Sequence, residues 1–139
     1  MNNKEYADLV NQGQFPEDNM VAIDPPFVDQ RGEITNVWLG PSNSVSLITS
    51  KKGSSRASHW HQNDWHGAYV ISGELEYFER DIDGTNVKEP IIVKAGEMVF
   101  SKPNVVHKML FMQDTVFITV NGIIKDHSGY ENSVHRVEF

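Results

Sequence analysis

The chain has 139 residues, a formal net charge of −7 at pH 7, six histidines and no cysteine. Its length fits one domain with a core of its own. The lack of cysteine excludes disulfides, thiolate catalysis and sulfur-ligated metals, so nitrogen and oxygen would have to bind any metal. Nucleic-acid binding needs clustered lysine and arginine, so the acidic balance argues against nucleic acid as a partner.

Membrane association is not indicated either. Hydrophobic residues make up 39% of the chain, and no apolar run approaches the ~20 residues that cross a bilayer. The first ten residues, MNNKEYADLV, lack the basic segment and following apolar segment of a signal peptide. We therefore expect a cytoplasmic protein without a membrane partner.

The N-terminal part of the chain predicts a helix followed by an arm. Residues 4–13 carry apolar side chains on one helical face, and Gly13 is expected to end the helix. Three prolines between residues 14 and 27 disfavour a continuing helix and predict an extended segment there. We place a boundary after residue 27, so that 1–27 form a helix and arm and 28–139 form the main domain.

From residue 28 onward the pattern predicts β-strands. Short runs rich in β-branched and apolar residues alternate with turns that contain glycine, proline or asparagine. Many short strands separated in this way are typical of an all-β sandwich or barrel. The predicted strands cover residues 34–39, 45–49, 68–71, 74–79, 91–93, 98–100, 108–111 and 116–120.

A cluster of three histidines, His59, His61 and His66, lies within eight residues. Residues i and i+2 of a strand face the same side, so His59 and His61 are expected to point the same way. Two neutral imidazoles on one face can share a divalent transition metal such as Fe, Zn, Mn, Ni or Cu. A pair of solvent-facing histidines is the alternative, and the third histidine nearby favours the metal.

A second segment, Gly96 to His107, reads as a turn, a strand, a turn and a strand that begins near the histidine. An ordinary hairpin with one incidental histidine would have the same pattern. A small closed barrel, however, brings together strands that are distant in sequence, so His107 can join His59 and His61. A mononuclear metal site takes three or four ligands from at least two segments. His127 and His135 lie in a polar tail and are expected at the surface.

These two segments resemble the two motifs of the cupin superfamily. In the first, His66 stands where the family has glutamate; in the second, Lys102 and Asn104 stand where it has proline and glycine, and Phe111 where it has asparagine. The resemblance implies a single small cupin (jelly-roll) β-barrel with a site in its mouth. The residues that carry the spacing of the two motifs are Gly53, His59, His61, His66, Gly73, Gly96 and His107. The resemblance implies that the four histidines among them are metal ligands.

A narrower resemblance is to the nucleotide-sugar cupins, the 3,5-epimerases and 3,4-ketoisomerases. It rests on residues 29–32, 56–61 and the tail 129–139. In that group no metal is needed: a histidine takes the proton beside a sugar ketone, and an arginine helps to hold the diphosphate. The resemblance implies His59 and Arg56 as catalytic residues. This chain departs from the group at His66, where the ketoisomerases carry an amide.

Further residues are candidates for substrate binding. Arg31, Arg56 and Tyr69 are expected to contact the substrate, and Trp60 beside the histidines is placed to stack on a sugar or base. Tyr69 and Tyr77 are candidates for a general acid if they face the mouth of the barrel.

Three functions fit these residues. The first is a metal-binding isomerase or epimerase that acts on a sugar or sugar nucleotide by proton abstraction beside a carbonyl. The second is a metal-dependent dioxygenase or lyase acting on a small organic acid or diketone, which open coordination positions on the metal would favour. The third is a non-catalytic ligand-binding cupin, which has least support because binding alone needs no cluster of four histidines.

We also predict a homodimer. Residues 14–27 have little of their own to bury, and cupins of this kind resemble proteins that exchange N-terminal strands between subunits. A bare barrel edge would invite uncontrolled strand pairing, and a partner's arm would cover it.

Overall fold

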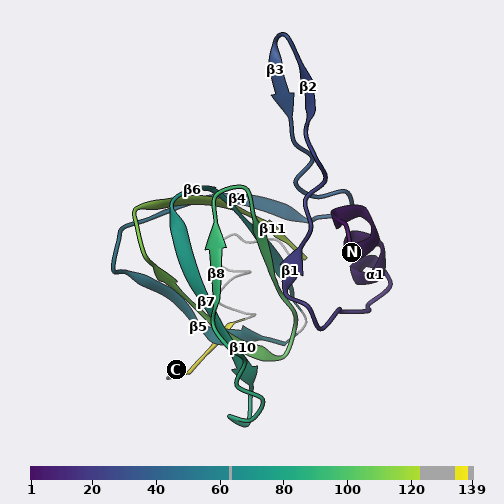
Figure 1. Cartoon of the computed structure of the whole chain (residues 1–139). Helices are drawn as coiled ribbons and strands as arrows, with labels where there is room; N and C mark the ends of the chain where they lie inside the picture. The colour runs from purple at the N-terminus through teal and green to yellow at the C-terminus, as the bar shows by residue number, and fades with distance from the viewer. Residues whose placement is uncertain (63, 123–133, 138–139) are drawn as a thin grey trace.

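Two antiparallel five-stranded sheets face each other and form a jelly-roll barrel (Figure 1). This confirms the all-β class that the strand pattern predicted and the jelly roll that the motif resemblance implied. The structure is a computed structural model and describes residues 1–62, 64–122 and 134–137. The first sheet has the order β1-β9-β6-β11-β4, with β1 (Met20–Val21), β4 (Ser44–Ser50), β6 (His66–Ser72), β9 (Met98–Ser101) and β11 (Thr115–Asn121). The second has the order β12-β5-β10-β7-β8, with β5 (Ser55–His61), β7 (Glu74–Asp81), β8 (Ile91–Lys94), β10 (Val105–Phe111) and β12 (Val134–Arg136).

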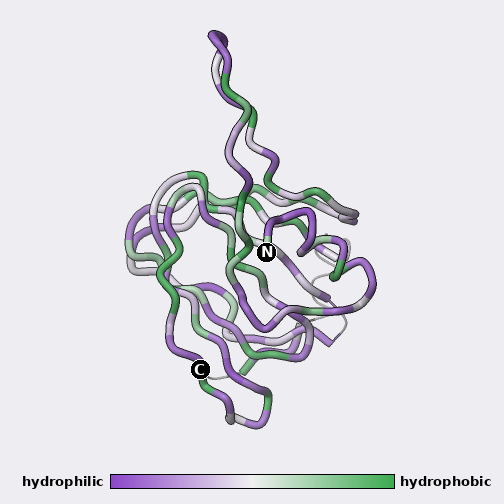
Figure 2. The backbone as a smooth tube through the Cα atoms, turned by 45° about the vertical axis from the view of Figure 1, so that its right-hand side comes forward, coloured by the Kyte–Doolittle hydropathy of each residue, from purple (hydrophilic) through white to green (hydrophobic). Residues whose placement is uncertain are grey.

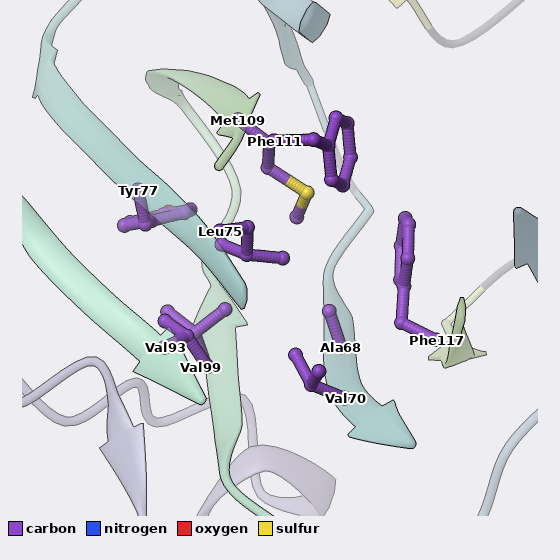
Figure 3. Close-up of a cluster of buried hydrophobic side chains, with 9 residues drawn as sticks. All are labelled: Ala68, Val70, Leu75, Tyr77, Val93, Val99, Met109, Phe111 and Phe117. Atoms are coloured by element: carbon purple, nitrogen blue, oxygen red, sulfur yellow. The ribbon is translucent and has the colours of Figure 1, made fainter. Parts of the chain in front are cut away.

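The main core lies between the two sheets. Alternate side chains of each strand point inward, because successive residues of a strand face opposite sides. Figure 3 shows these side chains converging from both sheets. The cluster consists of Ala68, Val70, Leu75, Tyr77, Val93, Val99, Met109, Phe111 and Phe117.

A short helix covers the outer face of the first sheet. Helix α1 (Asn3–Asn11) lies within two residues of its predicted bounds, and the Asn2 side chain caps it by accepting a hydrogen bond from the Glu5 N–H. Tyr6 and Val10 pack with Phe100 and other apolar side chains of the sheet in a second cluster. In the described part of the chain, no helix has both the length and the apolar character needed to cross a bilayer.

The strand predicted over residues 34–39 is wrong. Strands β2 (Phe27–Asp29) and β3 (Gly32–Ile34) form a hairpin that projects away from the barrel (Figure 1), and the residues from 35 to 43 form no strand. This segment instead packs beside the helix: the Asn36 carbonyl accepts a hydrogen bond from the Asn3 side chain, and Trp38 stacks on Phe100. Tertiary packing therefore overrides the β-propensity of the segment.

The residues predicted to form an arm take part in the barrel of their own chain. Strand β1 pairs with β9 and so covers that edge of the first sheet. The hairpin of β2 and β3 is the part that extends into solvent, as Figures 1 and 2 both show.

Candidate functional site

A cavity of about 490 Å³ lies between the two sheets, on the side away from the helix-covered face. Its walls come from β5 and β10 of one sheet and from β4, β6 and β11 of the other. Met109 and Phe117 of the main core form part of its lining. Among the described residues the lining includes four histidines and Arg56 but no carboxylate, so the cavity is suited to an anionic ligand even though the chain is acidic.

Three of the histidines come together closely. His59 and His61 alternate along β5, and His107 of β10 is paired directly with His59 across the sheet. All three are buried, and one ring nitrogen from each lies within 4.8 Å of the others. The Nε2 atoms of His59 and His61 are 3.1 Å apart. The arrangement matches the prediction from the motif spacing, and a set of neutral nitrogen donors fits Fe, Zn, Mn, Ni or Cu.

His66 lines the same cavity from the opposite sheet, at the start of β6. Its ring centroid lies 4.9 Å from that of His107 and 6.0 Å from that of His61. It is not a member of the compact three-histidine set. The structure therefore brings three of the four predicted ligands into one compact set, with His66 in the same cavity but outside that set.

A β-bulge places Arg56 in the cavity. His59 pairs with His107 but Ala57 pairs with Lys108, so Ser58 is an extra residue in β5, and Ala57 and Ser58 both have positive φ angles. Regular alternation would put Arg56 and His59, three residues apart, on opposite faces. The bulge shifts that alternation by one residue, and both side chains line the cavity.

The Arg56 side chain is held across the gap between the two sheets. Its Nε donates to the Ser50 hydroxyl at 2.7 Å and its Nη2 to the Thr49 carbonyl at 3.0 Å. Two of the five guanidinium N–H groups are engaged in this way. The position of the group is thus set before any ligand arrives.

A buried polar layer lies beside His107. The Tyr77 hydroxyl donates to Glu79 Oε1 and is also 2.9 Å from the Ser101 hydroxyl, while the Tyr77 ring stacks near that of His107. Lys88 forms a 2.8 Å ion pair with Glu79 Oε2. Burial, followed by the charge of Glu79, raises the pKa of Tyr77 well above its ordinary value. Tyr77 is therefore neutral around pH 7, and it does not line the cavity.

Glu79 is a buried polar residue beside the cavity that was not among the predicted site residues. The sequence did contain a signal for this residue. Leu75, Tyr77 and Glu79 alternate along one strand, so the carboxylate is expected on the same inward face as the two apolar side chains. Asp64, also not predicted, is 1% exposed and has its Oδ2 atom 4.0 Å from Nδ1 of His61.

Three other predicted residues lie outside the cavity. Arg31 is at the tip of the projecting hairpin, where its guanidinium pairs with Asp29. Trp60 faces the other side of β5 and stacks on exposed His135, with ring centroids 4.1 Å apart. Tyr69 packs against the helix-side cluster. His127, and most of the tail that resembles the ketoisomerases, lie outside the described residues.

Comparisons with known proteins agree with this architecture. The profile of the family described as "Cupin domain" matches residues 46–121, more than half of the chain. A double mutant of the QdtA 3,4-ketoisomerase from Thermoanaerobacterium thermosaccharolyticum, in complex with TDP, aligns with a TM-score of 0.67 and 20% identity over 86% of this chain and 88% of that chain. No curated protein sequence matches this chain.

Two further solved structures have the same fold. The dTDP-4-dehydrorhamnose 3,5-epimerase from Sulfolobus tokodaii aligns with a TM-score of 0.64 and 14% identity over 82% of this chain and 73% of that chain. The capsular polysaccharide assembling protein CapF from Staphylococcus aureus aligns with a TM-score of 0.61 and 23% identity over 90% of this chain and 37% of the CapF chain.

Proposed function

This chain belongs to the cupin family, and on that premise we propose that it is an isomerase or epimerase that abstracts a proton beside the carbonyl of a sugar nucleotide. The observation that carries the proposal is the shared cavity of His59 and Arg56, a base and a fixed cation on one strand. Similar folds named as a 3,4-ketoisomerase bound to TDP and a 3,5-epimerase support the substrate class.

In the metal-free protein, the proposed chemistry assigns one role each to His59 and Arg56. A C–H bond beside a carbonyl is acidified by the neighbouring C=O, so a neutral imidazole can take its proton and leave an enolate. His59 is the base. Reprotonation of the same carbon from the opposite face gives the epimer. Transfer of the neighbouring hydroxyl proton to the enolate oxygen, followed by protonation of the former carbonyl carbon, gives the isomer. Arg56 holds the diphosphate by charge-assisted hydrogen bonds. The cavity, lined by imidazoles and Arg56 without a carboxylate among the described residues, favours the anionic substrate.

A divalent transition metal is the proposed cofactor, with His59, His61 and His107 as the residues that would hold it and His66 beside them. When bound, such an ion would polarise a carbonyl oxygen as a Lewis acid. A histidine nitrogen that coordinates a metal cannot accept a proton at the same time. His59 therefore serves as ligand or as base in a given molecule, and metal content decides between the two.

Metal binding is expected to depend on the three-histidine set. Wild-type protein should bind one equivalent of Zn²⁺ or Co²⁺ and gain thermal stability, because a ligand that binds only the folded state stabilises it. His107→Ala should lose both effects, while His66→Ala should retain binding. His135→Ala, outside the cavity, is the control. Calorimetric titration measures the binding of each ion, and thermal shift measures the gain in stability. Wild-type protein that binds neither ion would contradict the metal site and favour the metal-free reaction.

The activity is tested by proton exchange. The protein is first screened by thermal shift with nucleoside diphosphates, and then a keto-sugar nucleotide is incubated with it in D₂O and followed by NMR. Deuterium incorporation at the carbon beside the ketone is the expected result. No shift with any nucleotide and no exchange would overturn the proposal.

Arg56→Lys is expected to weaken binding of the nucleoside diphosphate about tenfold. Lysine presents a point charge and cannot reproduce the planar two-point contact of a guanidinium with phosphate. Arg80→Lys makes the same chemical change on β7, outside the cavity lining, and should bind as wild type. Equal affinity of the Arg56→Lys variant and wild type would remove Arg56 from the site.

The second candidate is a metal-dependent dioxygenase or lyase acting on a small organic acid or diketone. The compact, buried set of three histidines favours it, since three protein ligands leave coordination positions open for substrate. Oxygen consumption by iron-loaded protein with a diketone, in the absence of any nucleotide effect, would support this alternative over the isomerase.

We also propose that the protein is a homodimer in which the hairpin of β2 and β3 packs on a second copy. Phe27, Val28 and Ile34 of the hairpin are 60–62% exposed, and an isolated two-stranded hairpin is marginally stable in water. Sedimentation at micromolar concentration should give a dimer mass, and Val28→Asp with Ile34→Asp should give a monomer. Val87→Asp, at a similarly exposed position in another loop, is the control. A wild-type monomer would contradict the dimer.

A further inference from the structure

Asp64 puts a buried carboxylate directly behind one of the cavity histidines. The residue lies between β5 and β6, three positions after His61, and is only 1% exposed. Its Oδ2 atom is 4.0 Å from Nδ1 of His61. Burial of a carboxylate is costly unless a positively polarised partner compensates its charge. The His61 ring provides such a partner, so this position has a physical reason to be acidic.

The two nitrogens of the His61 ring face different surroundings. Nδ1 is the atom nearest Asp64, whereas Nε2 is 3.1 Å from Nε2 of His59, within the three-histidine set. A neutral imidazole carries one N–H, and a carboxylate favours that proton on the nitrogen nearest to it. The lone pair is then on the opposite nitrogen. In histidine metal sites, a carboxylate that accepts a hydrogen bond from the ring fixes ligand orientation and basicity; at 4.0 Å, Asp64 acts on the His61 ring through its charge.

We propose that Asp64 is a positioning residue that holds His61 as the Nδ1–H tautomer and so directs the lone pair of Nε2 into the cavity. The assignment also accounts for the charge of the site. No carboxylate lines the cavity among the described residues. Asp64 supplies the negative charge from behind His61 instead. The role in catalysis rests on the proposed function, but the tautomer of His61 does not.

The first test reads the tautomer in chelator-treated wild-type protein. Ring nitrogen chemical shifts of His61, from ¹⁵N-labelled protein, should report a proton on Nδ1. In Asp64→Ala the Nε2–H form should increase, because the acceptor beside Nδ1 is gone. Asp114→Ala removes an aspartate that accepts from the Lys52 N–H at an exposed turn, and should leave the His61 shifts unchanged. A proton on Nε2 in wild type, or no response to Asp64→Ala, would overturn the proposal.

The second test measures affinity for Zn²⁺ alone by calorimetry. Asp64→Asn, which keeps the shape of the side chain and removes its charge, should bind Zn²⁺ about 10- to 100-fold more weakly than wild type. Asp114→Asn should bind as wild type. Unchanged affinity in Asp64→Asn would count against the proposal for the metal-bound state.

The two tests separate this proposal from the proposed function. Wild-type protein that binds no Zn²⁺ but carries a His61 proton on Nδ1, and that responds to Asp64→Ala, would uphold the role of Asp64 and refute the metal site. Exchange activity with His61 protonated on Nε2 would refute Asp64 and leave the isomerase standing. If the Asp64 variants do not fold, the wild-type shifts alone still decide the tautomer.

Discussion

Replacing His59 with alanine is expected to lower the rate of deuterium exchange beside the substrate ketone by about 10²- to 10⁴-fold, the usual contribution of a general base. Binding of the nucleoside diphosphate should change little, because Arg56 is anchored by Ser50 and Thr49 rather than by the histidines. The effect should therefore fall on kcat more than on affinity. NMR exchange rates and calorimetric affinities measured on the same preparation give both quantities.

Comparison with His107→Ala identifies the mechanism behind that loss. If His59 acts as a base without metal, His107→Ala should retain far more exchange activity than His59→Ala. If His59 acts as a ligand, the two variants should lose metal and activity together, since both belong to the same set. His135→Ala controls for loss of an imidazole on the outer side of the barrel. Exchange at the wild-type rate in His59→Ala would exclude this residue from the chemistry.

Replacing Lys88 with methionine is expected to lower the free energy of unfolding by about 3 kcal/mol, at the low end for a broken buried pair because Lys88 is partly exposed. The Glu79 side chain is 2% exposed and would lose its 2.8 Å ion pair. The ammonium also bonds the Asn19 side chain and the Glu17 carbonyl, so the segment before β1 would lose these two contacts as well. Urea unfolding followed by circular dichroism measures the change.

Two further variants make this measurement specific. Lys102→Met breaks an ion pair with Glu17, whose side chain is 88% exposed, and should cost less than about 1 kcal/mol. Glu79→Gln combined with Lys88→Met removes both charges and should recover part of the lost stability. A Lys88→Met variant no less stable than Lys102→Met would mean that Asn19 and Tyr77 alone satisfy the Glu79 carboxylate.

Local sequence was sufficient for those features that depend on neighbours in the chain. The alternation of apolar residues and the spacing of glycine and proline predicted most strands of the barrel, because side-chain direction repeats every two residues in a strand. The same period predicted that His59 and His61 share a face, and they do. The motif spacing predicted that His107 joins them from a distant strand, and the pairing of β10 with β5 brings it there.

Tertiary structure decided the features that depend on contacts between distant segments. The bulge at Ala57 and Ser58 turns Arg56 toward the cavity, against the simple alternation that would have pointed it outward. Lys88 forms its ion pair with Glu79, and Asp64 lies behind His61, only in the folded chain. The segment 35–43 has strand-like residues but packs beside the helix. In each case, contacts between distant segments outweigh the local conformational preference of the backbone. The two-residue period of a strand carries no information about such contacts.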